Sequence, residues 1–193
     1  MDQLGEIMTT SGFYLGGGTA LALLLDHRHS VDLDWFHPKD FDPRQITERI
    51  QDAGIGLTIL RTEEGTLHGL LSGVRVSLLR YRYPLLRPLV MWSQYRCHLA
   101  ALEDLVCMKL VAITQRGAKK DFIDIYALGQ GTLTLAEMLR LYQRKFDTQD
   151  IAQVLYALGY FADADPEDMP RLYLNTDWRT IKRTLESWVR EIR

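Results

Sequence analysis

The stretch FYLGGGTALALLLDHRHSVDLDWFHP, residues 13–38, decides how this chain is interpreted. Its three consecutive glycines, Gly16–Gly18, break a short apolar segment, and Thr19 follows them as a predicted helix N-cap. The next residues predict a helix over Ala20–His27, and because this helix is apolar on every side we expect it to be buried. Alternation of apolar and acidic residues over Val31–Phe36 predicts a strand.

The glycine turn and the acidic strand suggest a chemistry when they are taken together. Backbone amides of a glycine turn that opens a helix can bind an anion, because no Cβ blocks its approach and the helix dipole favours negative charge. On the predicted strand, Asp32 and Asp34 point to the same face. Such a pair suits Mg²⁺, which usually bridges to substrate phosphates. Each feature alone is typical of a plain turn or a solvated strand face, but the pair predicts a metal–nucleoside triphosphate site.

The remaining patterns divide the chain into two regions. Up to Tyr81 helices and strands are mixed, with a helix that is capped by Asp42 and ends near Gly54. Three strands follow, predicted at Leu57–Thr62, Thr66–Leu71 and Val74–Tyr81. After Ala100 the patterns are helical, with a capping box at Thr134. We therefore expect an α+β fold, with a mixed sheet in residues 1–99 and a helical region in residues 100–193, which together form one compact unit.

Composition narrows the class of protein. The chain has 193 residues and a net charge of −2, which fits one globular domain that is not basic throughout. Its two cysteines, Cys97 and Cys107, cannot form a disulfide framework, so we expect reduced thiols and a cytoplasmic protein. The longest apolar run, Leu15–Leu25, has 11 residues, whereas a membrane span needs roughly 20. We expect neither a membrane helix nor a signal peptide.

The order of these motifs resembles the nucleotidyltransferase superfamily, in which a glycine turn precedes an Asp-hydrophobic-Asp or Glu pair. More specifically, the stretch resembles the AbiEii/AbiGii toxin family of nucleotidyltransferases. That family shows Gly-Gly-Thr-Ala-Leu and then Arg-x-Ser/Thr-x-Asp-hydrophobic-Asp. The matching residues here are Gly17, Gly18, Thr19, Ala20, Leu21, Arg28, Ser30, Asp32 and Asp34.

A second block, LEDLVCMKLVAITQRGAKKDFIDIYAL at residues 102–128, resembles the downstream motif of the same family. Its matching residues are Lys109, Leu110, Arg116, Lys120, Asp121 and Asp124. Lys109 lies in an apolar helical stripe, where its ammonium needs an anion or a route to solvent. Beside a phosphate site, a triphosphate would supply that anion.

The resemblance implies a nucleotidyltransferase-like mixed sheet with flanking helices and assigns roles to the matching residues. Asp32 and Asp34 would hold Mg²⁺ or Mn²⁺, and with Lys109 and Asp124 they would be the catalytic residues. Asp121 is a further candidate, which would hold neighbouring basic residues in place. The nucleotide phosphates would be bound by Gly17, Gly18, Thr19, Arg28, Ser30, Lys109 and Arg116.

The resemblance also implies an activity and partners. The enzyme would transfer a nucleoside monophosphate from an NTP to an acceptor hydroxyl and release pyrophosphate. It would be the toxin of a toxin–antitoxin or phage-defence system with a cognate antitoxin protein, and its acceptor would be RNA, foremost the 3′ end of tRNA, or else a protein hydroxyl. Arginines and aromatic residues interleave over residues 75–96, which suits single-stranded RNA as well as a core rimmed by arginines.

One departure leaves an alternative open. Many members of the superfamily carry a third acidic residue on a later strand, but no Asp or Glu lies between Glu64 and Glu103. Either Asp124 supplies this carboxylate or it is missing, and a missing carboxylate favours a degenerate module that binds nucleotide, RNA or a partner without turnover. A dinucleotide-binding oxidoreductase does not fit, because Leu21 stands where Gly-x-Gly-x-x-Gly needs its last glycine. The sequence does not give the preferred NTP or the oligomeric state.

Overall fold

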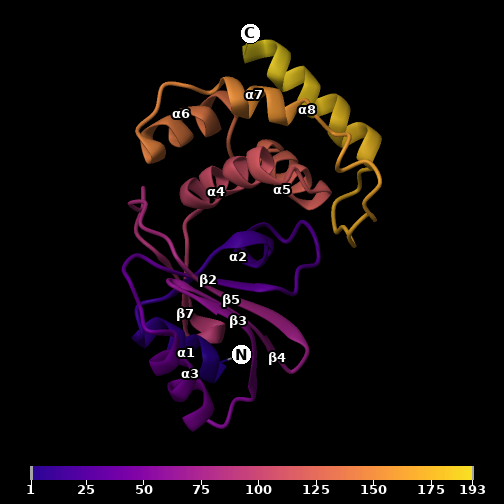
Figure 1. The fold of residues 1–193 in the computed structure, drawn as a ribbon. Coiled ribbons are helices and arrows are strands. Elements are labelled where there is room, and N and C mark those ends of the chain that lie inside the picture. Colours follow the sequence, from indigo (N-terminus) through magenta and orange to yellow (C-terminus); the bar gives the residue numbers. More distant parts are fainter. Residues whose placement is uncertain (1, 193) are drawn as a thin grey trace. The chain divides into compact units, whose positions relative to one another are not determined.

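The computed structural model describes residues 2–192, which divide into two compact units (Figure 1). The sheet unit contains the residues up to 20 and residues 30–101, and the helical unit contains residues 21–29 and those from 102 onward. Helix α2 (Gly17–Leu25) therefore starts in the sheet unit and ends in the helical unit. The predicted α+β fold class is confirmed.

The sheet unit is built on a seven-stranded mixed sheet in the order β3-β4-β5-β2-β1-β7-β6. The strands are β1 (Tyr14–Leu15), β2 (Leu33–His37), β3 (Leu57–Glu63), β4 (Thr66–Leu71), β5 (Val74–Arg80), β6 (Val90–Trp92) and β7 (Cys97–Leu99). Strands β2 and β5 are parallel, as are β1 and β7, and the other neighbours are antiparallel. The parallel pairing brings β2, which contains Asp34, beside β5.

One face of this sheet forms the core of the unit. Helices α1 (Asp2–Thr10) and α3 (Pro43–Asp52) lie together on this side of the sheet (Figure 1). Trp35, Leu67 and Leu78 are fully buried on this face, whereas Asp34, His68 and Ser77, which alternate with them along the same strands, are half-exposed. The sequence predicted the start of α3, where the Asp42 carboxylate accepts a hydrogen bond from the Arg44 amide at 2.9 Å.

The helical unit contains five helices among the described residues, with α4 at its centre. They are α4 (Leu102–Gln115), α5 (Lys119–Gly129), α6 (Leu135–Phe146), α7 (Ala152–Leu158) and α8 (Trp178–Ile192). Helix α4 contacts α5, α6 and α7, and α8 closes against the same three helices. The predicted capping box is confirmed, since Thr134 and Glu137 cap each other at the start of α6.

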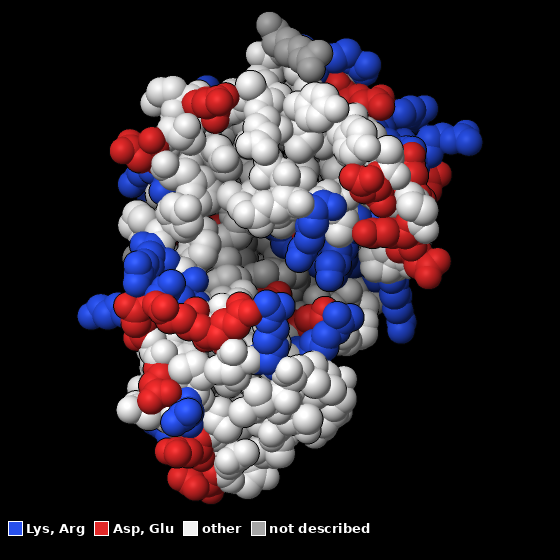
Figure 2. Space-filling model, viewed as in Figure 1, with Lys and Arg blue, Asp and Glu red and all other residues white. Residues whose placement is uncertain are grey.

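The surface carries both signs of charge. Figure 2 shows basic and acidic side chains interspersed on the face in view, as expected for a chain with a net charge of −2. Among the described residues, no helix combines the length and the apolar character that a membrane span requires.

The packing of helix α1 against the turn at Tyr95 can be tested by adding a single methyl group at Gly5. A Cβ on Gly5 would lie 1.9 Å from the carbonyl oxygen of Tyr95, in the 3₁₀ turn η1 (Ser93–Tyr95). We expect Gly5→Ala to lower the free energy of unfolding by about 1–3 kcal/mol in urea denaturation, as overpacking does. Gly56→Ala is the control, because no atom lies within 4 Å of its Cβ. Equal stability of the two variants would contradict this docking of α1.

Candidate active site

The glycine turn and the second aspartate are in direct contact. Gly17 has φ +62°, a left-handed conformation that favours glycine, and a Cβ at this position would lie 2.5 Å from Asp34 Oδ2. The Gly16 amide donates a hydrogen bond to the Asp34 carbonyl at 2.8 Å. The fold therefore places a carboxylate against the glycine turn that opens α2, as the paired motifs suggested.

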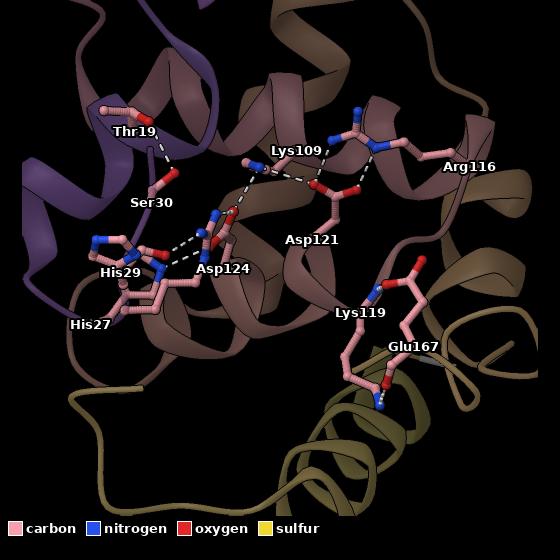
Figure 3. A network of polar contacts seen from close by, with 11 residues as sticks. Thr19, His27, His29, Ser30, Lys109, Arg116, Lys119, Asp121, Asp124 and Glu167 are labelled. Carbon is pink, nitrogen blue, oxygen red and sulfur yellow. Dashed lines mark hydrogen bonds and ion pairs between the residues drawn. The ribbon is translucent and has the colours of Figure 1, made fainter. Parts of the chain in front are cut away.

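Thr19 does not cap the helix, so that prediction is wrong. Helix α2 begins at Gly17, because the glycines join its first turn, and Thr19 already lies inside it. Its hydroxyl donates to the Asp32 carbonyl and lies 2.9 Å from Ser30 Oγ (Figure 3). Thr19 and Ser30 thus tie the start of α2 to the segment that leads into β2.

The two aspartates have different surroundings. Asp32 lies just before β2, and its Oδ1 is 3.8 Å from Nε of Arg75 on β5. Asp34 lies within β2 and is half-buried, and among the described residues no cation or hydrogen-bond donor lies within bonding distance of its carboxylate. A half-buried carboxylate without such a partner costs solvation free energy, and a bound cation would offset that cost.

The donor set fits magnesium. Within residues 2–192 no group of three or more His, Cys, Asp or Glu side chains has metal-binding geometry, so the chain offers the two carboxylates of Asp32 and Asp34. Magnesium prefers oxygen ligands and usually combines one or two carboxylates with water and substrate phosphate. The residues present are compatible with that arrangement.

Strand β5 places a serine, and not a third carboxylate, beside Asp34. The register pairs Asp34 with Ser77, and directly paired residues of neighbouring strands project from the same face. Ser77 Oγ lies 3.2 Å from Nδ1 of His68 on β4. A hydroxyl–imidazole pair therefore lies beside Asp34, which the sequence analysis missed because neither residue belongs to the resembling motifs.

Asp124 on α5 is the centre of a second polar cluster, in the helical unit (Figure 3). Its Oδ1 lies 2.7 Å from Nε2 of His27 and 2.6 Å from Nε of Arg28. Its Oδ2 lies 3.0 Å from Nη2 of Arg28 and 2.6 Å from Nζ of Lys109. Both oxygens thus have two partners each. Burial raises the pKa of Asp124, but Lys109, His27 and Arg28 outweigh it and hold the pKa far below its ordinary value.

Lys109 is buried with two carboxylates as partners. Its ammonium also contacts Asp121 Oδ1 at 2.9 Å, and Arg116 binds both oxygens of Asp121 at 2.8 and 3.0 Å. Burial lowers the pKa of Lys109, but Asp124 and Asp121 outweigh it and raise the pKa above its ordinary value. The anions that this lysine requires therefore come from α5, and contact of Lys109 with a triphosphate stays a prediction.

The predicted site residues fall into two sets. Gly17, Gly18, Thr19, Ser30, Asp32 and Asp34 belong to the sheet unit, and Arg28, Lys109, Arg116, Asp121 and Asp124 belong to the helical unit. In the second set, Arg28 and Lys109 bind Asp124, and Lys109 and Arg116 bind Asp121. Sequence reasoning predicted only local solvation for His27, which directly precedes Arg28, whereas the structure buries it against Asp124.

The close contact at Gly17 predicts coupling between two substitutions. Gly17→Ala should lower the free energy of unfolding by about 1–3 kcal/mol, because the new methyl group meets Asp34 at a positive φ. In an Asp34→Ala background the cost should fall, since Oδ2 is gone. A double-mutant cycle in urea measures this coupling, and additive effects would contradict the contact.

The cluster around Asp124 predicts an acid-sensitive stability. Asp124→Asn should lower the free energy of unfolding at pH 7 by about 3–5 kcal/mol, as breaking a buried ion pair does. A carboxylate whose pKa is depressed in the folded state stabilises the fold above its unfolded pKa of about 4. The difference between wild type and variant should therefore narrow as the pH falls below about 4, and denaturant titrations over pH 2.5–7 measure it. A difference that is independent of pH would contradict the charged state of Asp124.

Solved structures of other proteins share this architecture. Two solved structures share the fold: the nucleotidyltransferase toxin MenT4 from Mycobacterium tuberculosis H37Rv and a putative nucleotidyltransferase from H. pylori. For MenT4 the TM-score is 0.65 at 16% identity, with 100% of this chain and 82% of MenT4 covered. For the H. pylori protein the TM-score is 0.57 at 16% identity, with 98% and 90% covered.

Sequence relatives identify the family. An uncharacterized protein of Aquifex aeolicus (strain VF5) is 39% identical over 170 residues, which covers 86% of this chain and 82% of the relative. The family model described as "Nucleotidyl transferase AbiEii toxin, Type IV TA system" matches residues 9–87 and 73–190. The resemblance found in the sequence is thereby confirmed. The chain belongs to the AbiEii family of nucleotidyltransferase toxins and is a nucleotidyltransferase enzyme.

Proposed function

We propose that this nucleotidyltransferase transfers a nucleoside monophosphate from an NTP to a hydroxyl of RNA, with magnesium, and releases pyrophosphate. The observation that carries the proposal is the contact between the Gly17 turn and the Asp34 carboxylate, with Asp32 two residues away. An anion-binding turn and a cation-binding pair side by side are what a metal–triphosphate substrate requires.

The reaction follows from these groups. The acceptor oxygen attacks the α-phosphorus of the NTP, and the bond from that phosphorus to the pyrophosphate oxygen breaks. Magnesium, when held by Asp32 and Asp34, supplies positive charge against the triphosphate and the departing pyrophosphate. The backbone amides at the start of α2 stabilise phosphate oxygens without any rearrangement, because the turn is already formed.

The basic cluster of the helical unit suits a polyanion. It contains the three cations Arg28, Lys109 and Arg116, and the side chain of Arg116 is 55% exposed. Asp124 holds Arg28 and Lys109 in fixed positions, so we propose that Asp124 acts by orienting these cations. We further propose that Lys109 neutralises triphosphate charge.

RNA is the acceptor class that the surface chemistry favours. Strand β5 and the segment after it carry Arg75, Arg82 and Arg87 with Tyr83, and both Arg75 and Tyr83 are exposed. Arginine pairs with phosphate, and exposed aromatic rings stack on unpaired bases. The family description as a type IV toxin–antitoxin toxin leads us to propose a cognate antitoxin as well.

A degenerate binding module is the second candidate. It is favoured by strand β5, which offers Ser77 and no acidic residue beside Asp34. It is opposed by Asp34 itself, which keeps its carboxylate at the glycine turn.

Transfer is tested with each α-labelled NTP, magnesium and total cellular RNA. The wild type should label RNA, and Asp34→Asn should reduce the rate at least about 100-fold, because the amide cannot hold the cation. Asp26→Asn is the matched control: Asp26 is exposed and has φ +47°, which asparagine tolerates, so its rate should equal that of the wild type. NTP binding without incorporation into RNA would favour the binding module.

A further inference from the structure

Three neighbouring strands carry a polar row across one face of the sheet. The register pairs Asp34 of β2 with Ser77 of β5, and Ser77 with His68 of β4. All three side chains therefore project from the same face, with adjacent strands about 4.8 Å apart. Ser77 Oγ lies 3.2 Å from His68 Nδ1, so the row is joined by a hydrogen bond.

This row lies on the face of the sheet opposite to α1 and α3. Leu67, Val76 and Leu78, which alternate with His68 and Ser77 along β4 and β5, are fully buried on the face that α1 and α3 cover. His68 and Ser77 themselves are half-exposed. Both side chains of the hydroxyl–imidazole pair therefore lie outside the buried core of the sheet unit.

We infer that Ser77 and His68 form the acceptor end of the site, where Ser77 contacts the attacking hydroxyl and His68 receives its proton. This inference rests on the proposed transfer reaction. Attack by a hydroxyl requires a proton acceptor. Asp34 is a poor one when it holds a cation, and β5 supplies no carboxylate.

The proton transfer balances without another reactant. Ser77 donates its hydroxyl hydrogen to the Nδ1 lone pair of neutral His68, and its oxygen accepts a hydrogen bond from the acceptor hydroxyl. As the acceptor oxygen bonds to the α-phosphorus, its proton passes to Ser77 and the serine proton passes to Nδ1. Pyrophosphate leaves with the electron pair of the broken P–O bond. The imidazolium then releases its proton to solvent.

The charged groups near His68 are few. Those that share its face come from the three neighbouring strands, and they are Arg61 and Glu63 on β3, Arg75 on β5 and Asp34 on β2. Arg61 is paired with Glu63, and Arg75 lies nearest to Asp32. The hydrogen-bond partner of His68 is thus the uncharged Ser77 hydroxyl.

The test separates proton transfer from folding and from nucleotide binding. Ser77→Ala removes the relay, and His68→Asn keeps a polar partner for Ser77 but cannot take up a proton. Each should lower kcat about 100-fold with little change in the KM for NTP, since general base catalysis contributes at least this much. Ser77→Thr, which keeps the hydroxyl, should stay within about tenfold of the wild type. Thr66→Ala, on the same face of β4, is the control and should be fully active.

The pH profile is the decisive measurement. In the wild type, kcat should fall toward acid pH as the imidazole becomes protonated, and in His68→Asn this acid limb should disappear. Urea denaturation checks that all variants fold. If the wild type is active, and Ser77→Ala and His68→Asn keep its kcat and its acid limb, the inference is wrong but the proposed function stands. A wild type that transfers no label to RNA overturns the proposed function, and the inference with it.

Discussion

The contact between Gly17 and Asp34 is the constraint on which the site depends. The left-handed backbone at Gly17 lets the chain turn from β1 into α2, and the missing Cβ leaves space for the Asp34 carboxylate. Any larger residue would push the carboxylate away from the turn. Because the Gly16 amide is bonded to the Asp34 carbonyl, backbone and side chain of Asp34 are both fixed relative to the same turn. One short-range contact thus joins the turn that we propose binds phosphate to the carboxylate that we propose binds the cation.

The helical unit contains ionised side chains that are buried and paired with one another. Asp124 and Asp121 are fully buried, and isolated carboxylates there would be costly. Each oxygen of Asp124 has two partners, and Lys109 bridges both carboxylates, so the charges are compensated by hydrogen bonds as well as by attraction. Such a network adds little stability over an apolar core, but it fixes the orientation of each cation. Fixed cations need no reorganisation when a phosphate arrives.

The mixed sheet places a hydroxyl–imidazole pair beside β2, the strand that contains Asp34. Because β2 and β5 are parallel, Ser77 rather than a carboxylate stands beside Asp34, and the antiparallel β4 adds His68. A hydroxyl–imidazole pair places no negative charge beside Asp34, unlike a third acid. Strands β4 and β5 therefore add no negative charge beside Asp34, the proposed cation ligand.

Local patterns in the sequence were enough for the parts that depend on neighbouring residues. They determined the α+β class, the Asp42 and Thr134 caps, the strands over residues 57–80 and the glycine turn before two aspartates, since periodicity and backbone freedom act over a few residues. They failed for Thr19, because its hydroxyl bonds to residues 11 and 13 positions away instead of capping its own helix. Strands β6 and β7 have only three residues each, too few for a periodic pattern. The partners of Lys109 and Asp124 and the alignment of Asp34, Ser77 and His68 were decided by the tertiary structure alone, because strand order and helix packing bring together side chains that are far apart in the chain.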